Sequence, residues 1–472
     1  MNCCYIDFYS LVATGLKVEI CREKEELKEI RKKIFYLILP ITLESILEMS
    51  VGLFSMAMVG RLGEIAIGSI GIGSRIANIV WAIFKGITIG AGVFVAQAYG
   101  AKKMDKLRKV IQQTILSSLI LVIVIQQIIF WNASKILSIF KPDAVLLSNA
   151  TQYLRIVSFG LPFLAIMLIA ISVLQSMGDA KTPFYMALVM NVVNIGFGFL
   201  FIFGKLGFPK LGLRGAAVAT VLAQFVGFCM AFYVFFRNNG ILNPLLNKNF
   251  FQLNLQEVKN IYRVGIPSSM ESLFWQLSAI ILTRIMLKYG NTVFAAYQLG
   301  LQAESISFMP AAGFGIAATT FIGQCVGAKD GEKGKKYLKE IMKGSMMITT
   351  LTTILLVFFP HGVLRMLTDK ENIIVLGVKY LIIMGVVQAA QNASGVLNGA
   401  LRGAGYTKVP MIVSGIGLWC IRIPASLFLA YILNTNIVMV WIAMGIDLVI
   451  RFFLSLYLYR KKDIYNTETV LE

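Results

Sequence analysis

The chain has almost none of the residues on which soluble enzymes commonly depend. Histidine occurs once in 472 residues, at His361, so a multi-histidine metal site and a Ser/His/Asp or Cys/His nucleophilic centre are excluded. The six cysteines form no CxxC pair. A GxxxxGK nucleotide-binding loop is also lacking. We therefore predict a protein that is not an enzyme, needs no cofactor, and does not pump by hydrolysing ATP.

Charged residues are scarce, at 14% of the chain against 57% hydrophobic residues, which is too apolar for an ordinary soluble globule. Apolar runs recur that are long enough to cross a hydrocarbon core of roughly 30 Å, and about twelve are predicted as spans. All are expected to be helices, because an open sheet edge does not survive in lipid. The predicted spans are 35–59, 64–98, 110–132, 145–177, 182–204, 212–236, 261–288, 292–326, 341–360, 372–401, 408–433 and 436–459.

Acidic residues are outnumbered, 24 against 44 basic ones, which leaves a net charge of +20. The basic residues gather in alternate loops between the spans, which is the positive-inside pattern of membrane proteins. The charge therefore indicates topology, not a nucleic-acid partner, and we expect a multi-pass protein of the cell (inner or plasma) membrane with both termini in the cytoplasm. The basic clusters are Arg31, Lys32, Lys33, Lys102, Lys103, Lys106, Arg108, Lys109, Lys329, Lys333, Lys335, Lys336, Lys339, Arg460, Lys461 and Lys462.

The sequence repeats itself. Shifted by 227 positions, residues from about 32 to 183 match a later stretch without a gap, and Gly100-Ala101-Lys102 falls on Gly327-Ala328-Lys329. The repeat predicts two six-span lobes in the same orientation, with substrate and coupling ion bound in the cleft between them near the bilayer midplane. The predicted organisation is a cytoplasmic tail over 1–33, an N-lobe over 34–238, a cytoplasmic linker over 239–258 with Pro244, Asn247 and Asn249 as helix breakers, a C-lobe over 259–460, and a cytoplasmic tail over 461–472.

Carboxylates inside the spans are the first candidates for function, because burying one in a membrane is costly. Glu44 and Glu48 lie four residues apart on one helical face, and the repeat places Glu271 at the position of Glu44 and Trp275 at that of Glu48. Two carboxylates this close disfavour joint ionisation, so the pair can exchange a proton, or hold Na⁺ with other oxygen ligands. Na⁺ at Glu48 is the only metal site that we predict. The alternative is that both acids are hydrated and only link helices.

Polar side chains in the spans are candidates to line the substrate cavity, with helix-to-helix hydrogen bonding as the alternative. Asp447 and Arg451, four apart in the last span, are expected to neutralise each other, and Glu304 is ambiguous. The predicted cavity residues are Ser55, Asn191, Trp275, Gln276, Gln298, Gln388, Gln391 and Asn392.

Several motifs together resemble the multidrug and toxic compound extrusion (MATE) family of secondary transporters. They are Val59-Gly60-Arg61-Leu62-Gly63 after Pro40, Val95-Ala96-Gln97-Ala98-Tyr99-Gly100-Ala101, the run from Leu174 to Pro183 with its counterpart from Leu401 to Thr407, and the run from Phe203 to Thr220. The resemblance covers about 35–460. It implies an all-α membrane protein with a V-shaped pair of six-helix lobes that exports amphipathic, mostly cationic compounds in exchange for Na⁺ or H⁺.

The chain departs from the family pattern at three acidic positions. Many members carry an aspartate in the first span where Ser55 stands, archaeal-type members carry one where Gly198 stands, and many carry an acid where Trp275 stands. Our hypothesis is that Glu48, with Glu44 and Asn194, replaces the first-lobe coupling site, and that Glu271 serves the second lobe.

From the sequence we therefore predict a secondary active antiporter that exports drugs and toxic metabolites, acts as a monomer, contacts small organic cations and membrane lipids, and binds no nucleic acid. A lipid-linked precursor flippase of the same broad superfamily is the alternative, and a scaffold protein without transport is a third. The charge of the cavity distinguishes the first two: a net acidic cavity favours cationic drugs, and a net basic one favours lipid phosphates.

Overall fold

The computed structural model describes residues 3–237, 240–243, 250–465 and 467–471, with backbone only for residues 3–22 and Leu53. The helix breakers predicted in the linker, Pro244, Asn247 and Asn249, lie outside the described residues. Every regular element in the described part is helical. The elements are α1 (Cys3–Gly60), α2 (Glu64–Gly100), α3 (Met104–Ser138), α4 (Ala144–Ser158), α5 (Leu161–Ser176), α6 (Lys181–Phe203), α7 (Leu213–Phe236), α8 (Leu255–Lys288), α9 (Asn291–Gly327), α10 (Gly331–Phe358), α11 (Pro360–Arg365), α12 (Glu371–Gly403), α13 (Lys408–Gly415), η2 (Ile416–Arg422), α14 (Ile423–Leu427), η3 (Phe428–Ile432) and α15 (Ile437–Lys461).

These elements make the twelve spans that the sequence predicts. In the described residues, eleven helices are long and apolar enough to cross a membrane, and α4 with α5 makes a twelfth span that is bent by 50°. Pro162 stands at the start of α5, where a missing backbone N–H costs no helical hydrogen bond. The eleventh span runs over Lys408–Ile432 and contains two π-helical stretches, η2 and η3.

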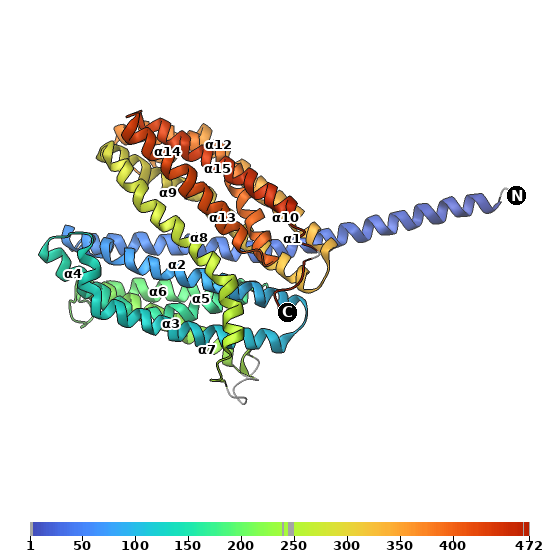
Figure 1. The fold of residues 1–472 in the computed structure, drawn as a ribbon, viewed down its shortest axis with the longest axis horizontal. Helices are drawn as coiled ribbons and strands as arrows, with labels where there is room; N and C mark the ends of the chain where they lie inside the picture. Colours follow the sequence, from blue (N-terminus) through green and yellow to red (C-terminus); the bar gives the residue numbers. More distant parts are fainter. Residues whose placement is uncertain (1–2, 238–239, 244–249, 466, 472) are drawn as a thin grey trace.

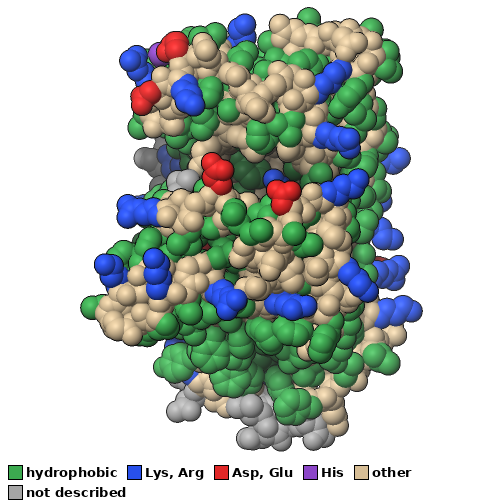
Figure 2. Space-filling model, turned by 90° about the vertical axis from the view of Figure 1, so that its left-hand side faces the viewer, with side chains coloured by type: hydrophobic (Ala, Val, Ile, Leu, Met, Phe, Trp, Pro, Cys, Tyr) green, Lys and Arg blue, Asp and Glu red, His purple; other side chains and the backbone are tan. Residues whose placement is uncertain are grey.

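The two lobes form a V (Figure 1). At one end of the molecule, which we call the closed end, their helices are in backbone contact. A side chain at Gly86 or Gly90 of α2 would overlap Ser269 or Gly265 of α8. Seen from the opposite, open end, the molecule is hollowed between its upper and lower halves (Figure 2). The cleft between the lobes is therefore accessible from one end only.

The repeat extends to the contacts of the closed end. Gln97 on α2 donates from Nε2 to the carbonyl oxygen of Gly403 on α12, at 3.0 Å. Gln324 on α9 donates in the same way to Ser176 on α5, at 2.9 Å. A shift of 227 maps each donor and each acceptor of the first bond onto those of the second. Each lobe thus holds the other by an equivalent hydrogen bond.

The first helix of each lobe also packs into the other lobe. Ile30, Ile34 and Leu37 of α1 lie in a core cluster made mostly by α9, α10 and α12, whereas Ile261 of α8 lies in the cluster of α2, α3 and α5. The predicted N-terminal tail is helical and continuous with the first span from Cys3 onward. α8 begins at Leu255, inside the predicted linker, with the Asn254 side chain capping its first turn.

Candidate ion and substrate site between the lobes

The N-lobe contributes two carboxylates and one ammonium group next to the contacts of the closed end, since Gln175 precedes Ser176 and Lys85 precedes Gly86. Glu44 is half-buried on α1 and accepts a hydrogen bond from Gln175 Nε2 on α5, at 3.4 Å. Glu48, one turn further along the same face of α1, is exposed. Lys85 on α2 is exposed, with its Nζ 4.3 Å from the centre of the Trp81 ring. The charges of Glu44 and Glu48 both act on Lys85, so the three form one electrostatic group.

The C-lobe holds its corresponding carboxylate in an ion pair. Glu271 on α8 is 8% exposed, and both of its oxygens accept from Arg402 Nη2 of α12 at 2.7 Å. Ser414 Oγ donates to the same carboxylate at 3.2 Å. Arg402 also acts electrostatically on Lys85 across the cleft. The negative charge of Glu271 is therefore balanced inside its own lobe.

The two carboxylates are related by the repeat, and so are their partners. A shift of 227 places Glu44 on Glu271 and Gln175 on Arg402, so each lobe has the same contact between its first and fourth spans. In the N-lobe the donor is a neutral amide, and in the C-lobe it is a guanidinium. Sequence reasoning did not single out Gln175 or Arg402. The sequence did contain a signal for them: each directly follows a leucine that the repeat matches, Leu174 or Leu401.

Asn194, predicted to join Glu44 and Glu48, contacts another residue of the predicted cavity. Its Oδ1 accepts from Ser55 Oγ at 3.2 Å, and its Nδ2 donates to Thr220 Oγ1 at 3.5 Å. Ser55 lies two turns beyond Glu48 on α1. Within the described part of the chain, no hydrogen bond joins Asn194 to either glutamate. The direct grouping of Asn194 with the acids thus stays a prediction.

The amides of α12 take part in hydrogen bonding between helices. Gln388 Nε2 and the hydroxyl of Tyr380 each donate to the carboxylate of Glu304 on α9 at 2.8 Å, and all three side chains are buried. Asn392, also buried, donates to Ser307 and to Thr349. Gln388 and Asn392 therefore show the helix-to-helix bonding that was the alternative for them, and Glu304 is a buried acid whose importance the sequence left ambiguous.

The other predicted cavity residues are spread over four spans. Gln298 is exposed on α9, Gln276 and Gln391 are half-buried, and Asn191 is buried in α6. Trp275 on α8 is 39% exposed. The guanidinium groups of Arg422 and Arg451 lie 5.6 Å and 4.7 Å from the centre of its ring.

Asp447 forms a buried ion cluster in the C-lobe. It pairs with Arg451, as its spacing predicts, at 2.8 Å, and also with Arg422 at 2.7 Å. Arg422 is the last residue of the π-helical stretch η2, and Gly417 in that stretch lies so close to Arg451 and Asp447 that a side chain there would overlap them. The widened π-helical turn thus brings the second arginine to Asp447.

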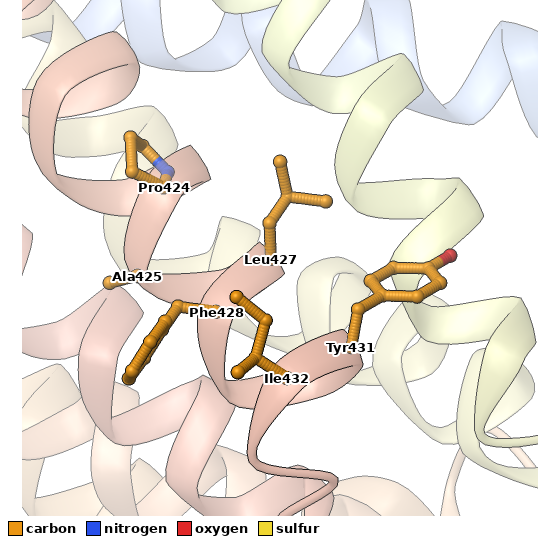
Figure 3. A pocket seen from close by; sticks show the side chains of 6 residues that line it. All are labelled: Pro424, Ala425, Leu427, Phe428, Tyr431 and Ile432. Atoms are coloured by element: carbon orange, nitrogen blue, oxygen red, sulfur yellow. The ribbon is translucent and has the colours of Figure 1, made fainter.

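A separate apolar groove lies on the eleventh span (Figure 3). Its lining is aliphatic and aromatic and carries no ionisable group except the phenol of Tyr431, so it can hold hydrocarbon but offers no ligand for an ion. The lining residues are Pro424, Ala425, Leu427, Phe428, Tyr431 and Ile432.

In the described residues, no group of three or more His, Cys, Asp or Glu side chains could hold a metal ion.

Comparison with known proteins decides the family. The model of the MatE family matches residues 40–200 and 267–428, two segments that are offset by the same 227 residues at their starts. The chain belongs to the MatE family. MatE proteins are membrane transporters and not enzymes, so the chain is a multi-pass membrane transporter.

Related MatE proteins and structures cover nearly the whole chain. "Probable multidrug resistance protein NorM" of Thermotoga maritima is 30% identical over 95% of this chain and 97% of its own length. "Probable multidrug resistance protein YoeA" of Bacillus subtilis is 25% identical over 94% and 97%. A solved MATE family transporter in an outward-facing conformation has a TM-score of 0.84 at 19% identity and covers 92% of this chain and 95% of its own. The MATE transporter VcmN of Vibrio cholerae also has a TM-score of 0.84, at 18% identity, with 94% and 100% covered.

Proposed function

We propose that this MatE transporter is a secondary antiporter that exports cationic, amphipathic drugs and toxic metabolites in exchange for Na⁺ or H⁺. The basic clusters predicted to face the cytoplasm follow Gly100 and Gly327 at the closed end. The proposal therefore places the closed end and both termini in the cytoplasm, and the open end of the cleft outside the inner membrane. Small organic cations and membrane lipids are its proposed partners, and a monomer its proposed state.

The observation that carries the proposal is the balance of charge inside the lobes. Five acids and four bases there form ion pairs or act on one another's charge, and this set carries one net negative charge when all are ionised (4 − 5 = −1); Arg75 and Arg284, exposed on α2 and α8, stand outside the set. A single Na⁺, proton or monovalent organic cation neutralises this charge. A flippase for lipid-linked phosphates needs a cationic cavity instead, so the balance favours the drug antiporter. The nine residues are Glu44, Glu48, Glu271, Glu304, Asp447, Lys85, Arg402, Arg422 and Arg451.

We place the coupling site in the N-lobe, at Glu48 and Glu44. Glu271 is neutralised by Arg402 at 2.7 Å, whereas among the described residues the repeat-related Glu44 accepts a hydrogen bond only from the neutral amide of Gln175. This assignment changes the expectation that Glu271 serves the second lobe, because a carboxylate paired inside its own lobe has little charge left to offer an incoming cation. Binding of the coupling ion to Glu48 and Glu44 then releases a cationic drug and shifts the equilibrium by its differential affinity for the two states.

The test of antiport is efflux of a fluorescent cationic dye from proteoliposomes with an imposed Na⁺ gradient or an imposed pH gradient. We expect one gradient to drive dye movement, and the one that does so names the ion. If the dye does not move under either gradient, the antiporter proposal is overturned. A flippase assay with a lipid-linked phosphate would then follow.

The repeat supplies a direct test of where coupling occurs. Gln175→Arg gives Glu44 the partner that Glu271 already has, so we expect gradient-driven efflux to fall by about tenfold or more, as when a group needed for one step is neutralised. Gln175→Met, of similar size and uncharged, is the matched control and should retain most activity. Equal loss in both variants would mean that packing at residue 175, and not the charge of Glu44, limits transport.

A further inference from the structure

The segment after the last span crosses from one lobe to the other at the closed end. Ile464 is 1% exposed and lies in the core cluster formed by α9, α10, α12 and the middle of α1. Leu471 is 8% exposed and lies in the N-lobe cluster of α2, α3 and α5. The anchors in the two lobes are therefore only seven positions apart (471 − 464 = 7), and Figure 1 shows the chain ending between the lobes, near the vertex of the V.

Hydrogen bonds hold the segment at both anchors. On the C-lobe side, the Tyr465 hydroxyl bonds to that of Tyr459 at 2.9 Å and Thr467 Oγ1 bonds to the Tyr406 hydroxyl at 3.0 Å. Burial, together with the bond to Tyr459, raises the pKa of Tyr465, which stays neutral. On the N-lobe side, the backbone N–H of Val470 donates to Gln97 Oε1 at 2.8 Å.

Gln97 connects the segment to a hydrogen bond between the lobes. Its amide nitrogen already donates to Gly403 of the C-lobe, so the bond from Val470 satisfies the remaining side of a fully buried amide. Opening of the closed end must break the bond to Gly403. It must also withdraw Leu471 from the N-lobe core or pull Ile464 from the C-lobe core, since the segment between them is short.

We propose that the segment described at 463–465 and 467–471 is a latch, which stabilises the state closed at this end and sets how often the lobes separate there. The latch uses no residue of the ion site, so it is independent of the coupling ion and of the substrate. Its two anchors, Ile464 and Leu471, are apolar, and the bond between Val470 and Gln97 fixes the position of the second anchor on the N-lobe.

The experiment measures the distance between the lobes, not transport. Spin labels are placed at Lys103→Cys and Glu332→Cys, two exposed positions on opposite lobes at the closed end, in the full chain with its native cysteines replaced by serine. The latch is weakened by Leu471→Asn, by Val470→Pro, which removes the N–H, and by truncation after Lys462. Glu468→Gln, at an exposed position of the same segment, is the matched control.

We expect each latch variant to raise the ratio of long to short distances by about tenfold or more, because a buried leucine side chain or a buried hydrogen bond is lost. The control should match the unmodified protein. Unchanged distances in Leu471→Asn, Val470→Pro and the truncated chain would overturn the latch. A lower unfolding temperature with unchanged distances would also overturn it, since the segment would then only stabilise the fold.

Discussion

At the scale of single residues, Asp447 holds together two buried arginines. Removing its charge leaves Arg422 and Arg451 without the carboxylate that pairs directly with both. Loss of one partner of a buried ion pair costs about 3–5 kcal/mol. We expect Asp447→Asn to lower the unfolding temperature in detergent strongly, whereas Glu332→Gln, which breaks the exposed pair with Lys335, should change it little. Equal, small shifts would mean that the cluster is hydrated in the folded protein.

Lys85 tests the proposed charge balance. Lys85→Met removes the only base of the N-lobe group and takes the net charge of the connected set from −1 to −2. Because attraction for a cation grows with that charge, the dye concentration at half-maximal efflux should fall by about three- to tenfold. The measurement is the initial rate over a range of dye concentrations. Lys103→Met, at the closed end, should leave it unchanged, and a higher value for Lys85→Met would contradict a substrate-attracting acidic cleft.

The sequence correctly indicated two structural relations at the candidate site. Equivalence of Glu44 and Glu271 followed from the repeat, and pairing of Asp447 with Arg451 from their helical spacing. The difference between the lobes did not follow, because it depends on Gln175 and Arg402, which lie 131 residues from the acids they bond. Spacing on one helix predicts neighbours within a turn or two, but it carries no information about a partner on another helix.

At the scale of helices, the spans were predicted from apolar length, and their breaks were not. The bend between α4 and α5 and the π-helical turns of the eleventh span interrupt stretches that remain apolar throughout, so hydropathy does not mark them. The packing of α1 and α8 into the opposite lobes was also missed. Each of these helices is long enough to pack in the hydrophobic cores of both lobes. An apolar face predicts burial, but it does not identify the core in which the face is buried.

Glycines on α2 decide how closely α8 approaches. A side chain at Gly90 would overlap the backbone of Gly265, whereas one at Gly71 of the same helix would meet nothing within 4 Å. Gly90→Val should therefore push the helices apart and reduce dye efflux by about tenfold or more, since backbone contact at the closed end is lost. Gly71→Val carries the same change in helix propensity and should retain activity. Initial efflux rates at matched protein content decide between them, and equal rates would show that the contact is not needed.

At the scale of the whole molecule, transport requires the closed end to open, and a covalent link there should prevent it. A Cβ at Gly323 on α9 would lie 2.9 Å from that of Ala96 on α2, so a shift of about 0.6 Å between the helices brings the pair to the roughly 3.5–4.5 Å that disulfides use. In a background without native cysteines, oxidation of Ala96→Cys with Gly323→Cys should stop gradient-driven efflux, and reduction should restore it.

The matched control joins two helices of one lobe. A Cβ at Gly198 on α6 would lie 4.0 Å from that of Ala219 on α7, so Gly198→Cys with Ala219→Cys should also form a disulfide. Lobes that move as rigid bodies keep this distance while the distance between α2 and α9 changes. The internal link should therefore leave efflux intact. Loss of efflux with the internal link, or continued efflux with the Ala96–Gly323 link formed, would show that transport proceeds by rearrangement within a lobe and not by separation of the lobes at the closed end.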